Sequence, residues 1–240
     1  MTAGIQKTFV LVHGAWHGGW VFSRVADMLR ARDHRVYTPT LTGMGDRSHV
    51  RHPGINLSTH IQDVINTIKW EQLNDVVLCG WSYGCAVSGG VADAIPDHIA
   101  SIVYLDGSVP ENGKSILEGS LPDEGIANFV RMAGDHDGLW VPPFPAAYFN
   151  VNKADAPMVD ALCTPQPLAT MSERIKLTGA YMSIPKKTYI FATGWNTQLR
   201  GAYDRVRALT GWTAHEVAVG HHVMLDAPDK LMELLIAAAP

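Results

Sequence analysis

A serine between two glycines, placed directly after an apolar run, is the feature that most constrains this chain. The motif is Gly80-Trp81-Ser82-Tyr83-Gly84, and the preceding residues 76–79 have the composition of a buried strand. The segment that follows is small, apolar and free of proline as far as Ile95, which favours a helix. A strand, a sharp turn and a helix in this order form a nucleophile elbow, which exposes the serine hydroxyl at the helix N-terminus.

Strand and helix patterns alternate through the first part of the chain and again at its end. Such alternation predicts an α/β fold with a mainly parallel sheet and helices on both faces. We expect helices at residues 20–32, 57–70 (with Ser58 as the N-cap), 83–95, 202–209 and 229–239. The expected strands are residues 8–12, 34–37, 76–79, 100–105, 188–192 and 213–219.

The alternation stops between residues 107 and 186, where prolines and aromatic residues are frequent. This segment is too long for a simple connection. We therefore expect a core made of residues 1–106 and 187–240, with residues 107–186 inserted as a mostly helical cap.

Several residues that can carry chemistry follow expected strands directly. His13 and Gly14, Ser82, Asp106 and His221 all occupy such positions. In open parallel sheets, ligands bind beyond the carboxyl ends of the strands. These residues are therefore expected to meet at one edge of the sheet.

Composition excludes several classes of partner. The net charge is −4 and no Lys/Arg cluster occurs, which argues against nucleic acid or an anionic membrane surface. The three cysteines lack metal-ligand spacing, and we expect neither a metal nor an organic cofactor. Residues 1–7 lead into a strand without a signal peptide, and no apolar stretch could span a bilayer, so we expect a cytoplasmic location. The sequence leaves the oligomeric state open, and a homodimer is compatible with it.

Three stretches resemble a known family: residues 9–20, the serine motif, and residues 220–228. Together they resemble the α/β-hydrolase fold, and more narrowly the small esterases grouped with methyl-salicylate esterases and plant hydroxynitrile lyases. The resemblance implies an inserted cap and a serine hydrolase that cleaves carboxylic esters through an acyl-enzyme. It aligns His221 with the family's base, because the pattern His-x-x-Met-Leu-x-x-Pro ends here at Pro228. His222 should point elsewhere, and His13 and His17 are expected to hold their loop by hydrogen bonds.

The acid of the triad is less direct to place. Many relatives carry it after the penultimate strand, but residues 191–198 contain no carboxylate. Asp106, at the end of the strand 100–105, is the best substitute and preserves the order Ser, Asp, His. Two alternatives remain open: Asn196 as a neutral orienter of His221, and a structural role in which Asp106 caps a turn or binds Lys114.

The oxyanion hole needs two backbone N–H donors. The elbow supplies one from Tyr83, and the family match implies Ala15 for the other. The candidate pocket residues are Trp16, Trp140, Phe144 and Trp195.

Such aromatic residues favour a small apolar substrate, an aryl or medium-chain ester. Related lyases carry Thr and Lys where this chain has Gly14 and His222, which counts against hydroxynitrile lyase activity. The sequence is also compatible with lactonase or amidase activity and, less readily, with a non-catalytic role as a ligand receptor.

Overall fold

One parallel sheet forms the centre of the molecule. The computed structural model describes residues 5–240; residues 1–4, on which the expectation of no signal peptide partly depends, lie outside it. The strand order is β2-β1-β3-β4-β7-β8, and every neighbouring pair is parallel. The strands are β1 (Thr8–Val12), β2 (Arg35–Tyr37), β3 (Val76–Trp81), β4 (Ile99–Leu105), β7 (Lys186–Ala192) and β8 (Trp212–Val217).

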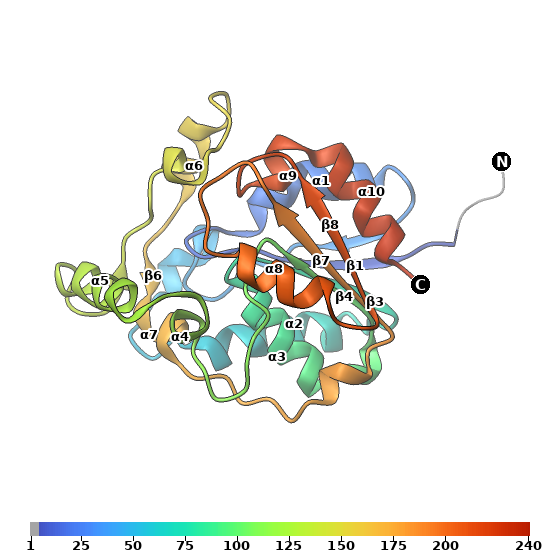
Figure 1. Cartoon of the computed structure of the whole chain (residues 1–240), viewed down its shortest axis with the longest axis horizontal. Helices are drawn as coiled ribbons and strands as arrows, with labels where there is room; N and C mark the ends of the chain where they lie inside the picture. Colours follow the sequence, from blue (N-terminus) through green and yellow to red (C-terminus); the bar gives the residue numbers. More distant parts are fainter. Residues whose placement is uncertain (1–4) are drawn as a thin grey trace.

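Helices cover both faces of this sheet (Figure 1). Helices α1 (Ser23–Arg30) and α10 (Pro228–Ala238) lie on one face, and α2 (Leu57–Trp70), α3 (Gly84–Ala94) and α8 (Arg200–Arg207) on the other. All six residues of β3 are buried, because this strand is central in the sheet and covered on both sides. The α/β fold class expected from the alternation is confirmed.

Some details of the main elements differ from expectation. The N-cap of α2 is Asn56, whose side chain accepts a hydrogen bond from the Thr59 amide at 2.9 Å. Ser58 instead donates its hydroxyl to Glu173 Oε1 at 2.6 Å, so its oxygen serves a distant contact rather than the helix end. The last strand ends at Val217 rather than at residue 219, and a short helix, α9 (Val223–Asp226), precedes α10.

Most of the segment between β4 and β7 gathers near the end of the sheet to which β7 and β8 point, and its last residues run past α3 to the start of β7 (Figure 1). Its short helices are α4 (Ile116–Ser120), α5 (Asp123–Gly134), α6 (Ala156–Leu162) and α7 (Leu168–Ser172). It also contains an antiparallel strand pair, β5 (Trp140–Val141) and β6 (Gln166–Pro167), that the sequence pattern does not reveal. The 3₁₀ helices of the chain are η1 (Gly19–Phe22), η2 (Gly45–Val50), η3 (Pro96–His98), η4 (Ala146–Phe149) and η5 (Ala180–Ser183).

Hydrogen bonds from Trp16, in the loop after β1, and from Arg24, on α1, hold this segment in place. Trp16 donates its backbone N–H to Gln166 Oε1 and its indole N–H to the Val141 carbonyl, both at 3.0 Å. Arg24 on α1 binds both carboxylate oxygens of Asp155, at 2.7 and 2.5 Å. Whether residues 107–186 behave as a separate cap stays a prediction. Across residues 5–240, no helix combines the length and the apolar character that crossing a bilayer requires.

Candidate active site

Ser82 occupies a strained turn between β3 and α3. Its φ is +54°, a left-handed conformation that non-glycine residues adopt rarely. The turn is tight: a β-carbon on Gly80 would lie 2.2 Å from the Gly84 carbonyl oxygen, and one on Gly84 would lie 2.5 Å from the Val12 carbonyl oxygen. Only glycine fits at both positions, which explains the two glycines of the motif. Ser82 itself is half-buried, with its backbone N–H bound to the Leu105 carbonyl at 2.9 Å.

Asp106 and His221 meet although they are far apart in sequence. His221 Nδ1 lies 2.6 Å from Asp106 Oδ2, and both side chains are buried. The carboxylate also accepts the Trp195 indole N–H at 2.8 Å and the Ala192 amide at 3.0 Å. These three donors satisfy the hydrogen-bonding capacity of the buried carboxylate. Asp106 therefore occupies the position beside the imidazole that the alternative would have given to Asn196.

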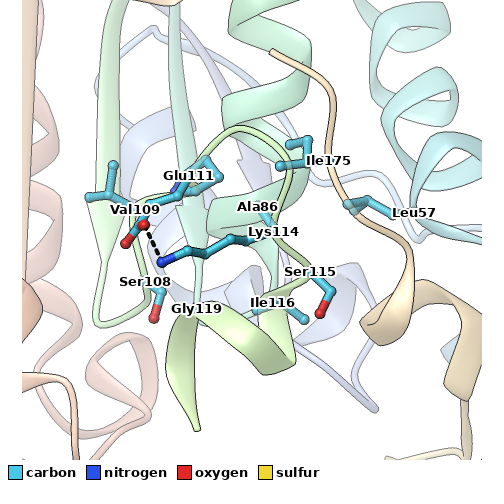
Figure 2. A pocket seen from close by; sticks show the side chains of 11 residues that line it. Leu57, Ala86, Ser108, Val109, Glu111, Lys114, Ser115, Ile116, Gly119 and Ile175 are labelled. Carbon is cyan, nitrogen blue, oxygen red and sulfur yellow. Dashed lines mark ion pairs between the residues drawn. The ribbon is translucent and has the colours of Figure 1, made fainter.

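The alternative partner of Asp106, Lys114, forms a different contact. Lys114 Nζ pairs with Glu111 Oε2 at 2.6 Å, and both residues line a small pocket (Figure 2). That pocket has a volume of only about 10 Å³, which is enough for one water molecule rather than a substrate.

The surroundings of His221 fix its ring. The imidazole packs against Trp195 and Phe149, with centroids 4.5 and 5.3 Å away. Its backbone N–H donates to the Phe149 carbonyl, and its own carbonyl accepts the Trp81 indole N–H, both at 3.0 Å. With Nδ1 bound to Asp106, Nε2 is the nitrogen left to exchange protons with a substrate or a nucleophile.

The two proposed oxyanion donors belong to residues that border one cavity, the candidate substrate pocket. Ala15 and Tyr83 both line the cavity that contains Ser82 and His221. Within residues 5–240, neither amide N–H is bound to another protein group. The Tyr83 hydroxyl is engaged elsewhere, 2.9 Å from His60 Nδ1.

Neighbouring histidines hold the loop after β1, as expected. His13 Nε2 accepts the Leu41 amide at 3.1 Å, and His13 Nδ1 lies 2.8 Å from the Gly14 carbonyl oxygen. Burial lowers the pKa of His13 to about 3, so this residue is neutral at neutral pH. His222 is turned away from the cavity, toward His17.

The cavity has a volume of about 520 Å³, and several aromatic side chains form part of its wall. Trp16, Phe144 and Trp195 line it as expected, but Trp140 does not. The expectation for Trp140 is wrong because its ring packs under the Arg51 guanidinium, 4.7 Å from the ring centroid. Further lining residues come mainly from the segment after β4: Leu117, Ser120, Leu121, Asn128, Phe129, Tyr148, Phe149 and Met171.

Comparison with known proteins places this arrangement in a family. The profile of the alpha/beta hydrolase family matches residues 9–234. The chain is an alpha/beta hydrolase. It is 42% identical over 241 residues to a carbendazim hydrolyzing esterase from Nocardioides sp. (strain SG-4G), covering 97% of this hydrolase and 99% of the relative. It is also 26% identical to methylesterase 10 of Arabidopsis thaliana, over 95% and 90% of the two chains.

Solved structures agree with this assignment. A structure described as an extracellular alpha/beta-hydrolase from a Paenibacillus species matches with a TM-score of 0.85 and 25% identity, over 97% of this hydrolase and 99% of that chain. A pyrethroid hydrolase from Sphingobium faniae JZ-2 shares the fold, with a TM-score of 0.75 and 20% identity over 97% of each chain. The solved structures show the shared fold, and the family match and the two esterase relatives identify the protein as an enzyme of the carboxylic ester hydrolase class.

Proposed function

We propose that this enzyme hydrolyses carboxylic esters with Ser82 as nucleophile, His221 as general base and Asp106 as the group that orients His221. One observation carries the proposal: His221 Nδ1 is bound to the buried Asp106 at 2.6 Å, in a ring that lines the same cavity as Ser82. A serine hydroxyl needs such an oriented base to become nucleophilic at neutral pH.

The proposed reaction follows from these positions. Ser82 Oγ attacks the ester carbonyl carbon while its proton passes to His221 Nε2. The N–H groups of Ala15 and Tyr83 stabilise the oxyanion of the tetrahedral intermediate. His221 then gives the proton to the departing alkoxide, leaving an acyl-enzyme. A water molecule then attacks the acyl carbon while His221 takes its proton. His221 returns this proton to Ser82 Oγ as the bond to the acyl group breaks and the acid is released.

The cavity wall supports an apolar, uncharged substrate. No lysine or arginine of the described chain lines it, whereas Trp16, Phe129 and Phe144 do. Its volume of about 520 Å³ suits a molecule of one or two rings or a medium acyl chain. The names of two relatives, which specify carbendazim and pyrethroids, agree with substrates of this kind. We therefore propose aryl and medium-chain esters as substrates, with carbendazim as one compound to test.

Residues 107–186 are proposed to act as the cap that closes this space over the core of residues 1–106 and 187–240. The supporting observation is that helices α4 and α5 contribute several wall residues, including Leu117 and Phe129. A cytoplasmic location and a homodimer stay predictions.

Ser82→Ala tests the nucleophile. We expect turnover of an aryl acetate to fall by roughly 10⁴-fold or more, with unchanged thermal unfolding. An aryl phosphonate should label the wild type at residue 82 and leave the variant unlabelled, as seen by mass spectrometry. Ser183→Ala, at an exposed serine that binds only the Ala180 carbonyl, is the matched control and should be labelled normally. Retention of turnover in Ser82→Ala would refute the proposal.

A substrate panel separates hydrolysis from the lyase reaction that related proteins carry out. It should contain aryl esters of increasing acyl length, a lactone, an anilide, carbendazim and mandelonitrile. We expect hydrolysis of the esters and no release of cyanide from mandelonitrile. Preferential cleavage of mandelonitrile would instead assign the site to a lyase.

A further inference from the structure

Two imidazoles that the proposed reaction does not use meet directly behind the site. His17 Nε2 and His222 Nε2 lie 2.9 Å apart, and both rings are buried. The Trp81 indole packs against both, with centroids 4.9 and 4.7 Å away, and donates its N–H to the His221 carbonyl. The pair thus lies between the loop that follows β1 and the loop that carries His221.

The hydrogen bonds determine which nitrogens of this pair carry protons. His17 Nδ1 lies 2.6 Å from the Ala15 carbonyl oxygen, which can only accept, so Nδ1 is protonated. The lone pair on His17 Nε2 then accepts the His222 Nε2–H, and it is shared with the Cys163 thiol at 3.4 Å. His222 Nδ1 is left as a bare, buried acceptor, without a partner in residues 5–240.

The environment keeps both rings neutral. Burial lowers the pKa of His17 to about 4. Burial, together with the neighbouring His17 and His221, holds the pKa of His222 well below its ordinary value. At neutral pH, the contact is therefore a neutral N–H···N hydrogen bond between two defined tautomers, not an ion pair.

This line of hydrogen bonds connects backbone groups that the reaction needs. At one end, His17 holds the carbonyl of Ala15, the residue whose amide is the proposed oxyanion donor. At the other end, the carbonyl of His222 accepts the amides of Leu225 and Asp226 at 2.8 and 3.0 Å, which ties it to α9. His222 directly follows His221, so a shift of His222 moves the base relative to the oxyanion donor.

We propose that His17 and His222 are positioning residues, which hold the Ala15 loop and the His221 loop at the spacing that ester hydrolysis requires. This inference rests on the proposed function. Leaving the buried His222 Nδ1 without a partner costs free energy, whereas an apolar side chain would fill the same space without that cost. A contribution to the geometry of catalysis explains why polar groups occupy this place.

The matched variants His222→Gln and His222→Met test the hydrogen bond. The two side chains are equal in length, but only Gln can donate an N–H to His17. We expect His222→Met to lower kcat for an aryl acetate by roughly 10- to 100-fold, the order of loss caused by misplacing a catalytic group by about 1 Å. KM should change less than about threefold, and His222→Gln should keep kcat within about threefold of wild type.

A second readout distinguishes positioning from mere packing. Phenylboronic acid binds an active serine as a tetrahedral anion, with an oxygen at the oxyanion donors. Its inhibition constant should rise in His222→Met in parallel with the fall in kcat, and stay near the wild-type value in His222→Gln. Wild-type kcat and wild-type inhibition in His222→Met would overturn the inference, as would equal losses in both variants.

A second pair covers the case in which His222→Met does not fold. His17→Asn keeps an N–H that can reach the Ala15 carbonyl, whereas His17→Leu, of the same size, has none. Asn does not reach His222, so both variants lose that hydrogen bond, and the Leu variant also releases the Ala15 carbonyl. We expect kcat to fall roughly tenfold in the Asn variant and further in the Leu variant, and wild-type kcat in the Leu variant would overturn the inference. Ser82→Ala separates the two proposals: if it stays active, the proposed function fails, whereas an inactive Ser82→Ala beside a fully active His222→Met refutes the positioning role alone.

Discussion

Asp106→Asn removes the charge beside His221 while keeping the shape of the side chain. The wild-type carboxylate accepts hydrogen bonds from His221 Nδ1, the Trp195 indole and the Ala192 amide, at 2.6, 2.8 and 3.0 Å. In the variant, the Ala192 amide still needs an acceptor, so the Asn oxygen takes the position of Oδ1. The new NH₂ group then takes the place of Oδ2 and faces two N–H donors.

The consequence for His221 is a change of tautomer. Nδ1 must lose its proton in order to accept from the new amide, so Nε2 becomes protonated and cannot take the proton of Ser82. The corresponding change in a serine protease triad costs about 10⁴ in kcat. That factor equals about 5.5 kcal/mol of transition-state stabilisation, at about 1.4 kcal/mol for each factor of ten. We expect kcat of Asp106→Asn to fall by roughly 10³- to 10⁴-fold, with KM changed less than about threefold.

Initial rates with an aryl acetate, together with the acylation burst, measure this loss. Trp195→Phe is the matched control, because it removes one donor to the carboxylate and keeps the charge. The control keeps both the carboxylate and the tautomer of His221, so its kcat should fall much less than that of Asp106→Asn, by roughly tenfold or less. The reasoning is refuted if Asp106→Asn keeps more than a tenth of wild-type kcat, or if Asn196→Ala is the more damaging change.

Two further predictions concern stability. Asp155→Asn weakens the contact of α6 with Arg24, whose side chain is 47% exposed. Because solvent screens this ion pair, we expect the free energy of unfolding, measured in urea, to fall by only about 1–2 kcal/mol. The control Lys230→Ala, in an exposed pair with Glu233, should change the free energy of unfolding by less than about 0.5 kcal/mol. An Asp155→Asn variant as stable as wild type would show that this contact does not anchor α6. Burial lowers the pKa of His60 to about 4, so between pH 6.5 and 4 only the unfolded state binds the proton, and the folded state loses about 1.4 kcal/mol per pH unit as the pH falls. His60→Gln removes this pH-dependent contribution of His60 to the free energy of unfolding. The difference in that free energy between wild type and variant should therefore shrink by roughly 2 kcal/mol from pH 6.5 to 5. A difference that does not depend on pH would contradict this prediction.

The sheet and the strand-end residues could be predicted because their signals are local. Residues 9–12 of β1 and 76–79 of β3 are continuous apolar runs with a glycine within two residues of their ends, and parallel strands bring their carboxyl ends to one edge. Asp106 could be singled out for the same reason: it follows β4 immediately, and residues 191–198 contain no competing carboxylate. The position beside His221 followed from topology, without knowledge of any side-chain conformation.

What the sequence could not predict depends on side-chain direction in irregular segments. Trp195 and Trp140 are both aromatic residues in loop-rich stretches, yet one donates to Asp106 and the other stacks under Arg51. Asn56 and Ser58 are both good helix caps, and the contact that decides between them comes from Glu173, which is distant in sequence. The pair His17–His222 was likewise out of reach, because only the folded chain brings the two residues together.

In the proposed triad the acid is Asp106, directly after β4, so the turn that follows β7 does not have to supply it. Trp195 still supports the carboxylate, but Asn196, Thr197 and Gln198 only border the cavity. Mutations in these three positions can therefore alter which molecules enter without dismantling the proton-transfer apparatus. Such separation gives an enzyme room to diversify toward new compounds while its chemistry stays intact.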